Sequence, residues 1–172
     1  MLIDRVFTVD ECSQLVNEFD LVENKNVEDN DFYFNSLGFY NLPGTLEHVD
    51  RLTQLVHTQY TNIVFSNTYT RVYQDNSILG IHTDRPGLDL TISICLENNQ
   101  IHWPLQVSNI EYSGVWQTGG DYSKWAQDYT SYSTEIGQGA LCQGVKYPHW
   151  RDRFPGDAGQ RAVYTFYHWT II

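Results

Sequence analysis

The sequence predicts an α+β fold that is mainly β, with a jelly-roll core and supporting helices at its N-terminal end. Two observations lead to this prediction. Apolar residues recur at helical spacing before about residue 60. After about residue 66, short segments rich in β-branched and aromatic residues are separated by Gly, Asn and Pro. Short strands with turn signals of this kind are typical of β-sandwiches and jelly-roll barrels.

The length and composition favour a single domain over residues 1–172. A chain of 172 residues is long enough to bury one hydrophobic core. Apolar residues make up 41% of it and charged residues 18%, which is the balance of a globular protein. We expect the helical support to span about residues 8–60 and the jelly-roll core about residues 66–172.

Two helices are predicted in the N-terminal part. Thr8-Val9-Asp10-Glu11 has the pattern of a capping box, in which Thr8 caps the helix and Glu11 reaches back to it. The apolar residues that follow at helical spacing are Cys12, Leu15, Val16 and Phe19. A second helix is predicted from Pro43 to Tyr60, with Pro43 near its start. Residues 23–31 are acidic and Asn-rich, which predicts a surface loop.

Strands are predicted in the remainder of the chain. Ser66–Tyr73 is rich in β-branched and aromatic residues, and Leu88–Leu96 alternates apolar residues with small polar ones. This alternation places the apolar side chains on one face of a sheet. The further strand candidates are residues 101–107, 132–136, 140–145 and 162–172.

Charge and cysteine content restrict the partners and the compartment. With 10 Lys and Arg against 21 Asp and Glu, the net charge of −11 disfavours nucleic acid and anionic membranes as partners. No apolar run approaches the length of a membrane span, and the first residues lack the order of a secretory signal. The 3 cysteines are far apart in the sequence, so we expect a reducing compartment and a cytoplasmic location.

The pattern His-x-Asp occurs twice, and the backbone context separates the two occurrences. His48-x-Asp50 lies in the predicted second helix, where side chains two residues apart point about 200° away from each other. We interpret it as part of a solvated helix face. His82-x-Asp84 follows a predicted strand, in extended or turn backbone where such side chains project the same way. We therefore interpret His82 and Asp84 as metal ligands.

A second histidine would complete a metal site of known chemistry. Two imidazoles and one carboxylate form the facial triad of non-haem iron(II) enzymes, which leaves coordination positions open for chemistry. His102 lies in a strand-like run, and His168 lies in the last predicted strand among aromatic residues, which suggests a packed role. His149 lies in an irregular stretch after a predicted strand, where loops commonly deliver site residues. We expect His149 to be the third ligand.

The order of these motifs carries a resemblance to a known family. A strand is followed by His82-x-Asp84, then by Gly139-Ala140-Leu141 before His149, and by Gly159-x-Arg161 after it. This order resembles the prolyl 4-hydroxylase-like branch of the iron(II)- and 2-oxoglutarate-dependent oxygenase superfamily. The resemblance covers most of the chain, because the two N-terminal helices are also similar to that branch. It implies a double-stranded β-helix core.

The resemblance also suggests which residues bind the cosubstrate. In the family, a basic residue on the strand after the distal histidine pairs with the far carboxylate of 2-oxoglutarate, and Arg161 matches that position. A guanidinium suits this role because it binds a carboxylate through two parallel hydrogen bonds. Arg151 and Arg153 remain rivals. Tyr73 matches a tyrosine that contacts the same carboxylate, although it could equally be an ordinary strand aromatic, and Thr91 could face the cosubstrate.

The function implied by the resemblance is hydroxylation of an unactivated C–H bond. The cofactor would be iron(II), with 2-oxoglutarate and O2 as cosubstrates and ascorbate as an optional reductant. The substrate would be a prolyl residue in a peptide or protein, or a small molecule. Neither a nucleic-acid partner nor a membrane is expected, and the oligomeric state is left open.

Alternative functions remain open from the sequence. One is a nucleic-acid demethylase of the same superfamily, because Arg161 followed by Thr165-Phe166 resembles that branch, although Tyr167 and the net charge argue against it. Another is a cupin-like module that binds a metal or ligand without catalysis. A third is a structural jelly-roll domain, since a fold does not prove a function.

Overall fold

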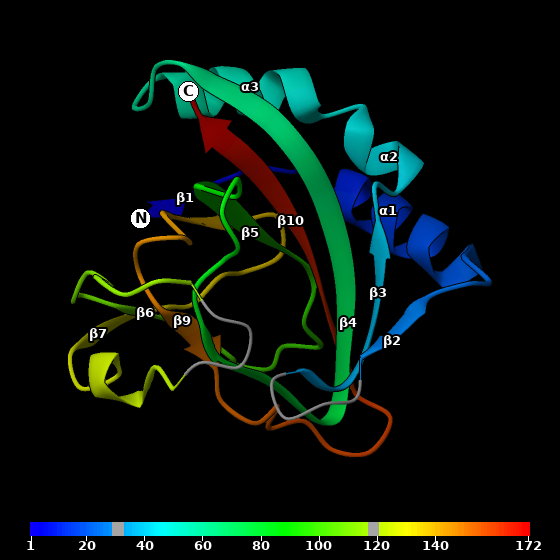
Figure 1. The fold of residues 1–172 in the computed structure, drawn as a ribbon. Helices are drawn as coiled ribbons and strands as arrows, with labels where there is room; N and C mark the ends of the chain where they lie inside the picture. Colours follow the sequence, from blue (N-terminus) through cyan, green and yellow to red (C-terminus); the bar gives the residue numbers. More distant parts are fainter. Residues whose placement is uncertain (29–32, 117–120) are drawn as a thin grey trace.

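The computed structural model describes residues 1–28, 33–116 and 121–172 (Figure 1). Helix α1, Val9–Leu21, begins at the predicted capping box. The Thr8 hydroxyl accepts a hydrogen bond from the Glu11 backbone N–H at 3.2 Å, and the Glu11 carboxylate accepts one from the Thr8 N–H at 2.8 Å. The first predicted helix is therefore confirmed together with its capping box.

The second predicted helix is divided in two. A short helix α2, Pro43–Leu46, has proline at its first position, and α3 spans Val49–His57. The break falls at Glu47 and His48, and His48 is the N-cap residue of α3. The pair His48 and Asp50 therefore lies at the start of a helix rather than within it. A single turn of 3-10 helix, η1, Ser123–Trp125, lies later in the chain.

Ten strands of the described chain form one sheet, in which all the pairings are antiparallel. The strands in the first half of the chain are β1 Leu2–Ile3, β2 Asn26–Glu28, β3 Tyr33–Tyr40, β4 Ile63–His82 and β5 Leu90–Glu97. The later strands are β6 Leu105–Ser108, β7 Tyr129–Tyr132, β8 Gly139–Cys142, β9 His149–Arg151 and β10 Ala162–Ile171. Along the sheet the order is β1-β8-β5-β10-β4-β9-β6-β7, with β3 also paired to β4.

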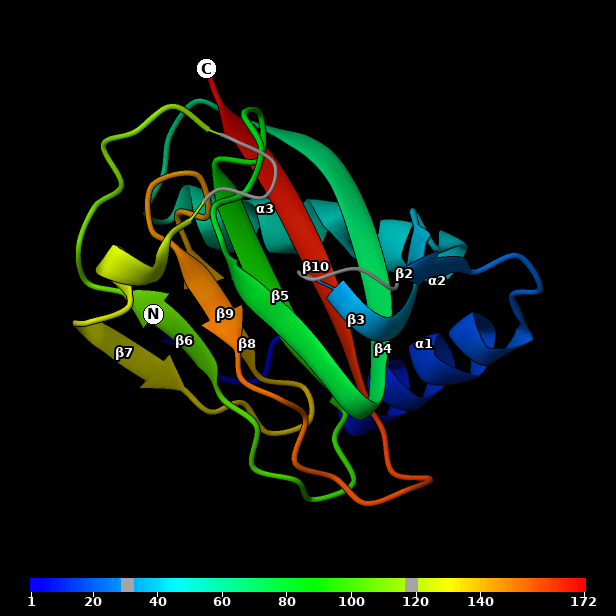
Figure 2. The ribbon, with the colours of Figure 1, turned by 60° about the horizontal axis from the view of Figure 1, so that its bottom comes forward.

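Strand β4 joins the two layers of the barrel. Its first part pairs with β10, and its pairing with β3 continues to Leu79, whereas its end, at Leu79 and His82, pairs with β9. One layer therefore contains β8, β5, β10 and the first part of β4, and the other contains the end of β4 with β9, β6 and β7. Figures 1 and 2 show the second group set apart from the first. This arrangement is a double-stranded β-helix, so the predicted jelly-roll core is confirmed.

The region predicted as helical support, residues 8–60, also contains strands β2 and β3, and the predicted strands 101–107 and 140–145 correspond to the shorter strands β6 and β8. Two further segments show the physical reason for such differences. Strand β7 ends at Tyr132, so the predicted strand 132–136 is displaced toward the N-terminus, where residues 129–132 pair with β6. Within the predicted loop 23–31, residues 26–28 form β2 by pairing with β3, and residues 29–31 lie outside the described part. In both cases a cross-strand partner decides the conformation, and local composition does not reveal that partner.

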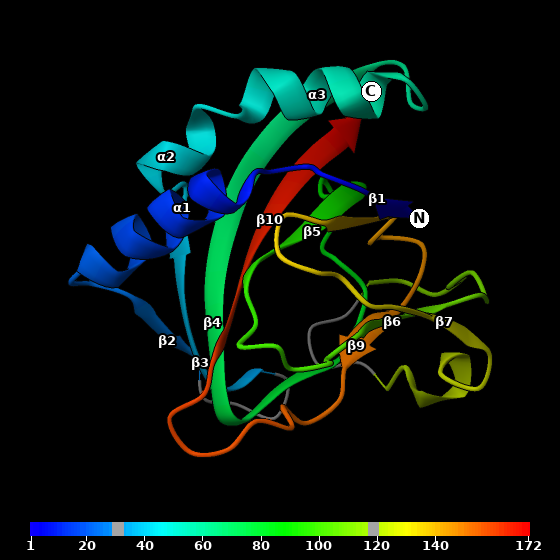
Figure 3. The same ribbon diagram turned by 180° about the vertical axis from the view of Figure 1, so that it is seen from behind.

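Buried side chains form two clusters on opposite sides of the β5–β10–β4 layer. The outer cluster joins the helices to the sheet, and it includes Cys12, Leu15 and Phe19 from α1, Leu52 and Val56 from α3, and Ile92, Ile94 and Trp169 from the strands. Figure 3 shows the helices on this side of the layer. The inner cluster fills part of the barrel with side chains that include Tyr73, Trp103, Phe154 and Tyr164. Among the described residues, no helix has the length and apolar character needed to cross a membrane.

Candidate metal centre

Strands β4 and β9 bring the three predicted ligands together. His82 is the last residue of β4 and is the cross-strand partner of His149, the first residue of β9. Asp84 follows two residues later, and its backbone N–H donates to the carbonyl of Gly144 at 2.9 Å. His149 thus lies on a short strand rather than in the predicted irregular stretch. The strand pairing fixes the separation of the two imidazoles.

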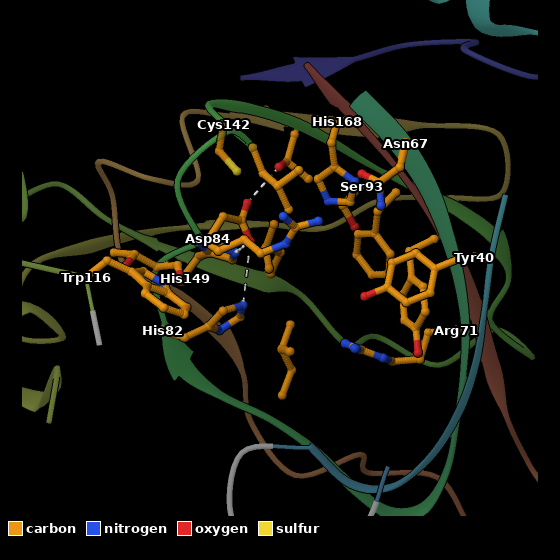
Figure 4. A pocket seen from close by; sticks show the side chains of 18 residues that line it. Tyr40, Asn67, Arg71, His82, Asp84, Ser93, Trp116, Cys142, His149 and His168 are labelled. Carbon is orange, nitrogen blue, oxygen red and sulfur yellow. Dashed lines mark hydrogen bonds and ion pairs between the residues drawn. The ribbon is translucent and has the colours of Figure 1, made fainter. Parts of the chain in front are cut away.

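The ligand atoms of the three side chains converge. One ligand atom from each of His82, Asp84 and His149 lies within 4.8 Å of the others. Asp84 Oδ1 is 3.9 Å from Nε2 of His82 and 3.6 Å from Nε2 of His149. The two imidazole ring centroids are 4.4 Å apart. Figure 4 shows the three side chains gathered on one side of a cavity.

Each of the three candidate ligands is oriented by a hydrogen bond to the atom that does not face the other ligands. Nδ1 of His82 lies 2.8 Å from the carbonyl of Gly80, and Nδ1 of His149 lies 3.0 Å from that of Tyr147. A ring that donates Nδ1–H to a carbonyl keeps the lone pair on Nε2, the atom that faces the carboxylate. The Thr91 hydroxyl donates to Asp84 Oδ2 at 2.7 Å, so Oδ1 remains for a metal.

The protonation states suit metal binding. Burial, and then the neighbouring His149, lowers the pKa of His82 well below its usual range. Burial alone would raise the pKa of Asp84, but the neighbouring histidines and the Thr91 hydroxyl outweigh burial and lower it. A neutral imidazole and an ionised carboxylate are the forms that coordinate a metal ion. The donor set of two nitrogens and one oxygen therefore fits iron(II) with open positions.

The triad lies on a cavity of about 280 Å³. Its walls include Leu79, Leu88, Leu105 and Phe166, with Asn67, Ser93 and His168 as polar groups and Arg71 and Arg85 as cations. In Figure 4, Arg71 and Tyr40 lie across the cavity from His82 and Asp84. Tyr40 is 53% exposed and Trp116 is 38% exposed, so these two aromatic side chains lie at its rim. The cavity is therefore mainly apolar, with a few polar groups.

Of the predicted cosubstrate residues, Thr91 lies on the cavity wall beside the triad, whereas Arg161 lies outside the cavity. Thr91 lines the cavity and holds Asp84. Arg161 does not line the cavity, and its guanidinium forms bidentate contacts with Asp20 at 2.7 and 2.8 Å and with Glu97 at 2.9 and 3.0 Å. Arg161 precedes β10, so its side chain joins that strand to α1 rather than entering the barrel. We therefore correct the expectation that placed Arg161 at the cosubstrate.

Tyr73 is fully buried beneath the cavity rather than lining it. Its ring packs against Trp103 with centroids 4.7 Å apart. Its hydroxyl accepts a hydrogen bond from Nη1 of Arg71 at 3.2 Å. Tyr73 is thus a packed strand aromatic that supports Arg71, and its contact with the cosubstrate carboxylate stays a prediction.

The two rival arginines also lie away from the cavity surface. Arg151 is fully buried, with its guanidinium 4.0 Å from the ring centroid of Tyr164 and one N–H donated to the carbonyl of Trp103. A second N–H points to the hydroxyl of Ser93 at 3.4 Å. Arg153 donates to Asn76 on the surface. Neither is positioned as a cation on the cavity wall.

Among the wall residues that sequence reasoning did not assign to the site are the polar and charged residues Asn67, Arg71 and His168. Asn67 and Arg71 alternate with Tyr69 and Tyr73 on β4, and side chains at every second position share a face. His168 is the cross-strand partner of both Asn67 and Thr91. The period-two pattern could have grouped the β4 residues, but only the strand register places His168 beside them.

Neither a protein-family model nor a curated protein matches the chain by sequence. Solved structures do match. HygX from Streptomyces hygroscopicus, with nickel and 2-oxoglutarate bound, has a TM-score of 0.72 at 11% identity, covering 99% of this chain and 82% of that one. A prolyl-4-hydroxylase from Pseudomonas putida has a TM-score of 0.70 at 12% identity, covering 100% and 92%.

A third match is an oxidoreductase of the 2OG-Fe(II) oxygenase family from Burkholderia pseudomallei, with a TM-score of 0.70 at 10% identity over 99% of this chain and 84% of that one. These matches extend over nearly the whole chain. The chain has the fold of the 2-oxoglutarate- and iron(II)-dependent oxygenases. At 10–12% identity these matches show a shared fold. A shared fold does not determine the reaction, which depends on the triad and the residues around its cavity.

Proposed function

We propose that the protein is an iron(II)- and 2-oxoglutarate-dependent dioxygenase that hydroxylates an unactivated C–H bond. The observation that carries this proposal is the convergence of His82, Asp84 and His149 on a cavity, with one ligand atom of each within 4.8 Å of the others. Three protein ligands leave coordination positions for a chelating oxo acid and for O2. The oxygenase fold raises the expectation but does not by itself establish the activity.

The overall reaction balances without any further reactant. One O2 and one 2-oxoglutarate are consumed with the substrate C–H, and succinate, carbon dioxide and the hydroxylated product are formed. Iron(II), when bound, would supply the activation of O2 with electrons that the oxo acid provides. The protein supplies the geometry of the ligands and the exclusion of solvent.

The roles of the protein groups follow from their contacts. His82 and His149 would hold the metal through Nε2, because their Nδ1 atoms face backbone carbonyls. Asp84 would bind through Oδ1 while Thr91 holds its other oxygen. Apolar side chains such as Leu79 and Phe166 limit the water around the reacting groups.

For the substrate, we propose a prolyl residue of a peptide or a small molecule. The cavity is rimmed by the half-exposed aromatic rings of Tyr40 and Trp116, which suit a compact organic group. Among the structural neighbours, one is a prolyl-4-hydroxylase, and HygX has also been solved with hygromycin B bound. Both substrate classes should therefore be screened.

The test of this function is succinate formation in the presence of iron(II), 2-oxoglutarate and O2, with prolyl peptides and small polar molecules as candidate substrates. We expect the wild-type protein to form succinate and His82→Ala to form none. His48→Ala is the matched control, because it removes the histidine of the second His-x-Asp pattern, and it should keep full activity. Equal turnover in the wild type and His82→Ala would exclude the proposed function.

A further inference from the structure

A carboxylate-binding group of side chains lies across the cavity from the triad and is occupied by a carboxylate of the protein itself. The carboxylate of Glu28, at the end of β2, is 2.7 Å from Nε of Arg71 and 3.0 Å from Nη2 of the same guanidinium. It also accepts hydrogen bonds from the hydroxyl of Tyr69 at 2.9 Å and from that of Ser36 at 3.1 Å. Charge-assisted bonds to a guanidinium, together with hydroxyl donors, are what an anionic carboxylate requires.

Two members of this group belong to the wall of the triad cavity. Tyr69 and Arg71 both line it, and they are the same-face neighbours of Tyr73 along β4. The Arg71 guanidinium is held in place by the Tyr73 hydroxyl at 3.2 Å and by the ring of Tyr69, whose centroid is 4.9 Å away. Arg71 is only 7% exposed. Its guanidinium is therefore a rigid, buried cation at the cavity.

The other cations of the described chain fit a cosubstrate carboxylate less well. Arg161 is paired with Asp20 and Glu97 away from the cavity. Arg151 is fully buried and does not line the cavity, and its guanidinium donates to the Trp103 carbonyl and to the hydroxyl of Ser93 on the wall. Arg85 lines the cavity but is exposed to solvent, where a charge pair contributes little. A cation that is buried and also lines the cavity is therefore found on β4, at Arg71, and not on the last strand.

We propose that Arg71 and Tyr69 bind the far carboxylate of the 2-oxo acid, and that Glu28 occupies this subsite until the cosubstrate displaces it. The inference rests on the proposed function and assigns the cosubstrate anchor to β4 in place of Arg161. Exchange of one carboxylate for another keeps the buried guanidinium paired, so it avoids the cost of an uncompensated charge. Because Glu28 competes for the subsite, it lowers the apparent affinity for the cosubstrate.

The test is calorimetric titration of 2-oxoglutarate into the protein loaded with Mn(II), so that binding is measured without turnover. Glu28→Gln removes the competing charge and should tighten 2-oxoglutarate binding several-fold. Arg71→Leu should weaken it by about 10- to 100-fold, the usual effect of losing a hydrogen bond to a charged group. Arg161→Leu is the matched control and should leave the affinity unchanged.

A second ligand separates a binding role from a structural one. 2-Oxobutyrate has the chelating end of 2-oxoglutarate but lacks the far carboxylate, so the wild type should bind it more weakly. The double variant Arg71→Leu with Glu28→Leu removes both buried charges together, which protects the fold, and it should lose this preference. If the preference persists in the double variant, or if Glu28→Gln does not tighten binding, the Arg71–Glu28 pair is only structural and the inference is overturned.

The failure of the proposed function would give a different result in the same experiment. In that case the Mn(II)-loaded wild type would bind neither oxo acid, whatever residue stands at position 71 or 28. Failure of this inference alone would leave 2-oxoglutarate binding intact in the wild type and equally intact in the Arg71 variants.

Discussion

The interior of the barrel has two halves that differ in how they are filled. In the closed half, the aromatic side chains of Tyr73, Trp103, Phe154 and Tyr164 pack edge to face around the buried Arg151. In the open half, the triad borders a cavity of about 280 Å³. Both halves use inward-facing residues of the same long strands, because β4 and β10 run through both.

Both halves contain buried polar atoms that have no hydrogen-bond partner among the described residues. Asn67 Oδ1 and Nδ1 of His168 line the cavity and have no hydrogen-bond partner within the described structure. Such atoms cost free energy unless water or a ligand satisfies them. In the closed half, Nε of Arg151 is likewise without a hydrogen-bond partner. The two halves therefore differ in packing, because aromatic rings fill the closed half and the open half leaves a cavity beside the triad.

The largest expected effect is on stability in the closed half. Trp103→Ala removes a buried indole that packs on Tyr73 and Phe154 and donates to the Asp152 carbonyl at 2.7 Å. We expect the free energy of unfolding to fall by about 3–5 kcal/mol, measured by urea denaturation. Trp116→Ala, at the rim of the open half, is the control and should cost much less. Equal losses would remove the distinction between the two halves.

Gly144→Ala should disturb the open half without removing a ligand. A Cβ at this position would meet the carboxylate of Asp84, and the clash forces that side chain to move. We expect metal affinity to fall by about 100-fold, at the upper end of effects from outer groups, measured by competition with a chelating dye. Gly159→Ala has nothing within 4 Å of its added Cβ, and although its φ of 89° makes the substitution cost some stability, it should spare metal affinity. An unchanged affinity in Gly144→Ala would mean that the Asp84 position is not critical.

Thr91→Val is a smaller change at the same carboxylate. Valine keeps the shape of threonine but cannot donate to Asp84 Oδ2, so the carboxylate is less firmly oriented. We expect metal affinity to fall by about tenfold, with little change in the temperature of unfolding without metal. A loss of stability with unchanged metal affinity would instead identify Thr91 as a packing residue.

The alkylation rates of the cysteines should differ least between the two halves. Burial raises the pKa of Cys95, in the closed half, to about 11, and burial with the Asp84 charge raises the pKa of Cys142, at the cavity, to about 12. The thiolate is the reactive form, so both should alkylate slowly in the native protein at mildly alkaline pH. Denatured protein is the control, and all three cysteines should react there. Rapid native alkylation of Cys142 would contradict a protonated thiol at the cavity.

Local sequence signals predicted much of the fold. The capping box at Thr8 and the alternation along Leu88–Leu96 are encoded by neighbouring residues, and both correspond to elements of the structure. The choice of His82 over His48 depended on local backbone conformation, and the structure places His82 at the end of a strand. The break between α2 and α3 and the strand β2 were missed, because contacts with distant segments decide them.

The cosubstrate side of the site could not be predicted in the same way. Arg161 matched a family position, but its guanidinium forms an ion pair with Asp20, which lies 141 residues away in the sequence. Arg71 was overlooked because a lone arginine on a strand gives no local signal of its partner. Only the register of β4 against β10, which pairs Arg71 with Tyr164, places it inside the barrel. The three candidate ligands were therefore predictable from the His-x-Asp motif and the order of motifs along the chain, whereas the charge on the opposite wall of the cavity was not.

Metal binding tests the central claim most directly. Calorimetric titration of the metal-free protein with Mn(II) should show one ion bound per chain in the wild type. Asp84→Ala should bind none while keeping the circular dichroism spectrum of a folded protein, and Asp50→Ala, at the second His-x-Asp pattern, should bind as the wild type does. Binding in Asp84→Ala equal to that of the wild type, or no binding in the wild type, would contradict the assignment of His82, Asp84 and His149 as a metal centre.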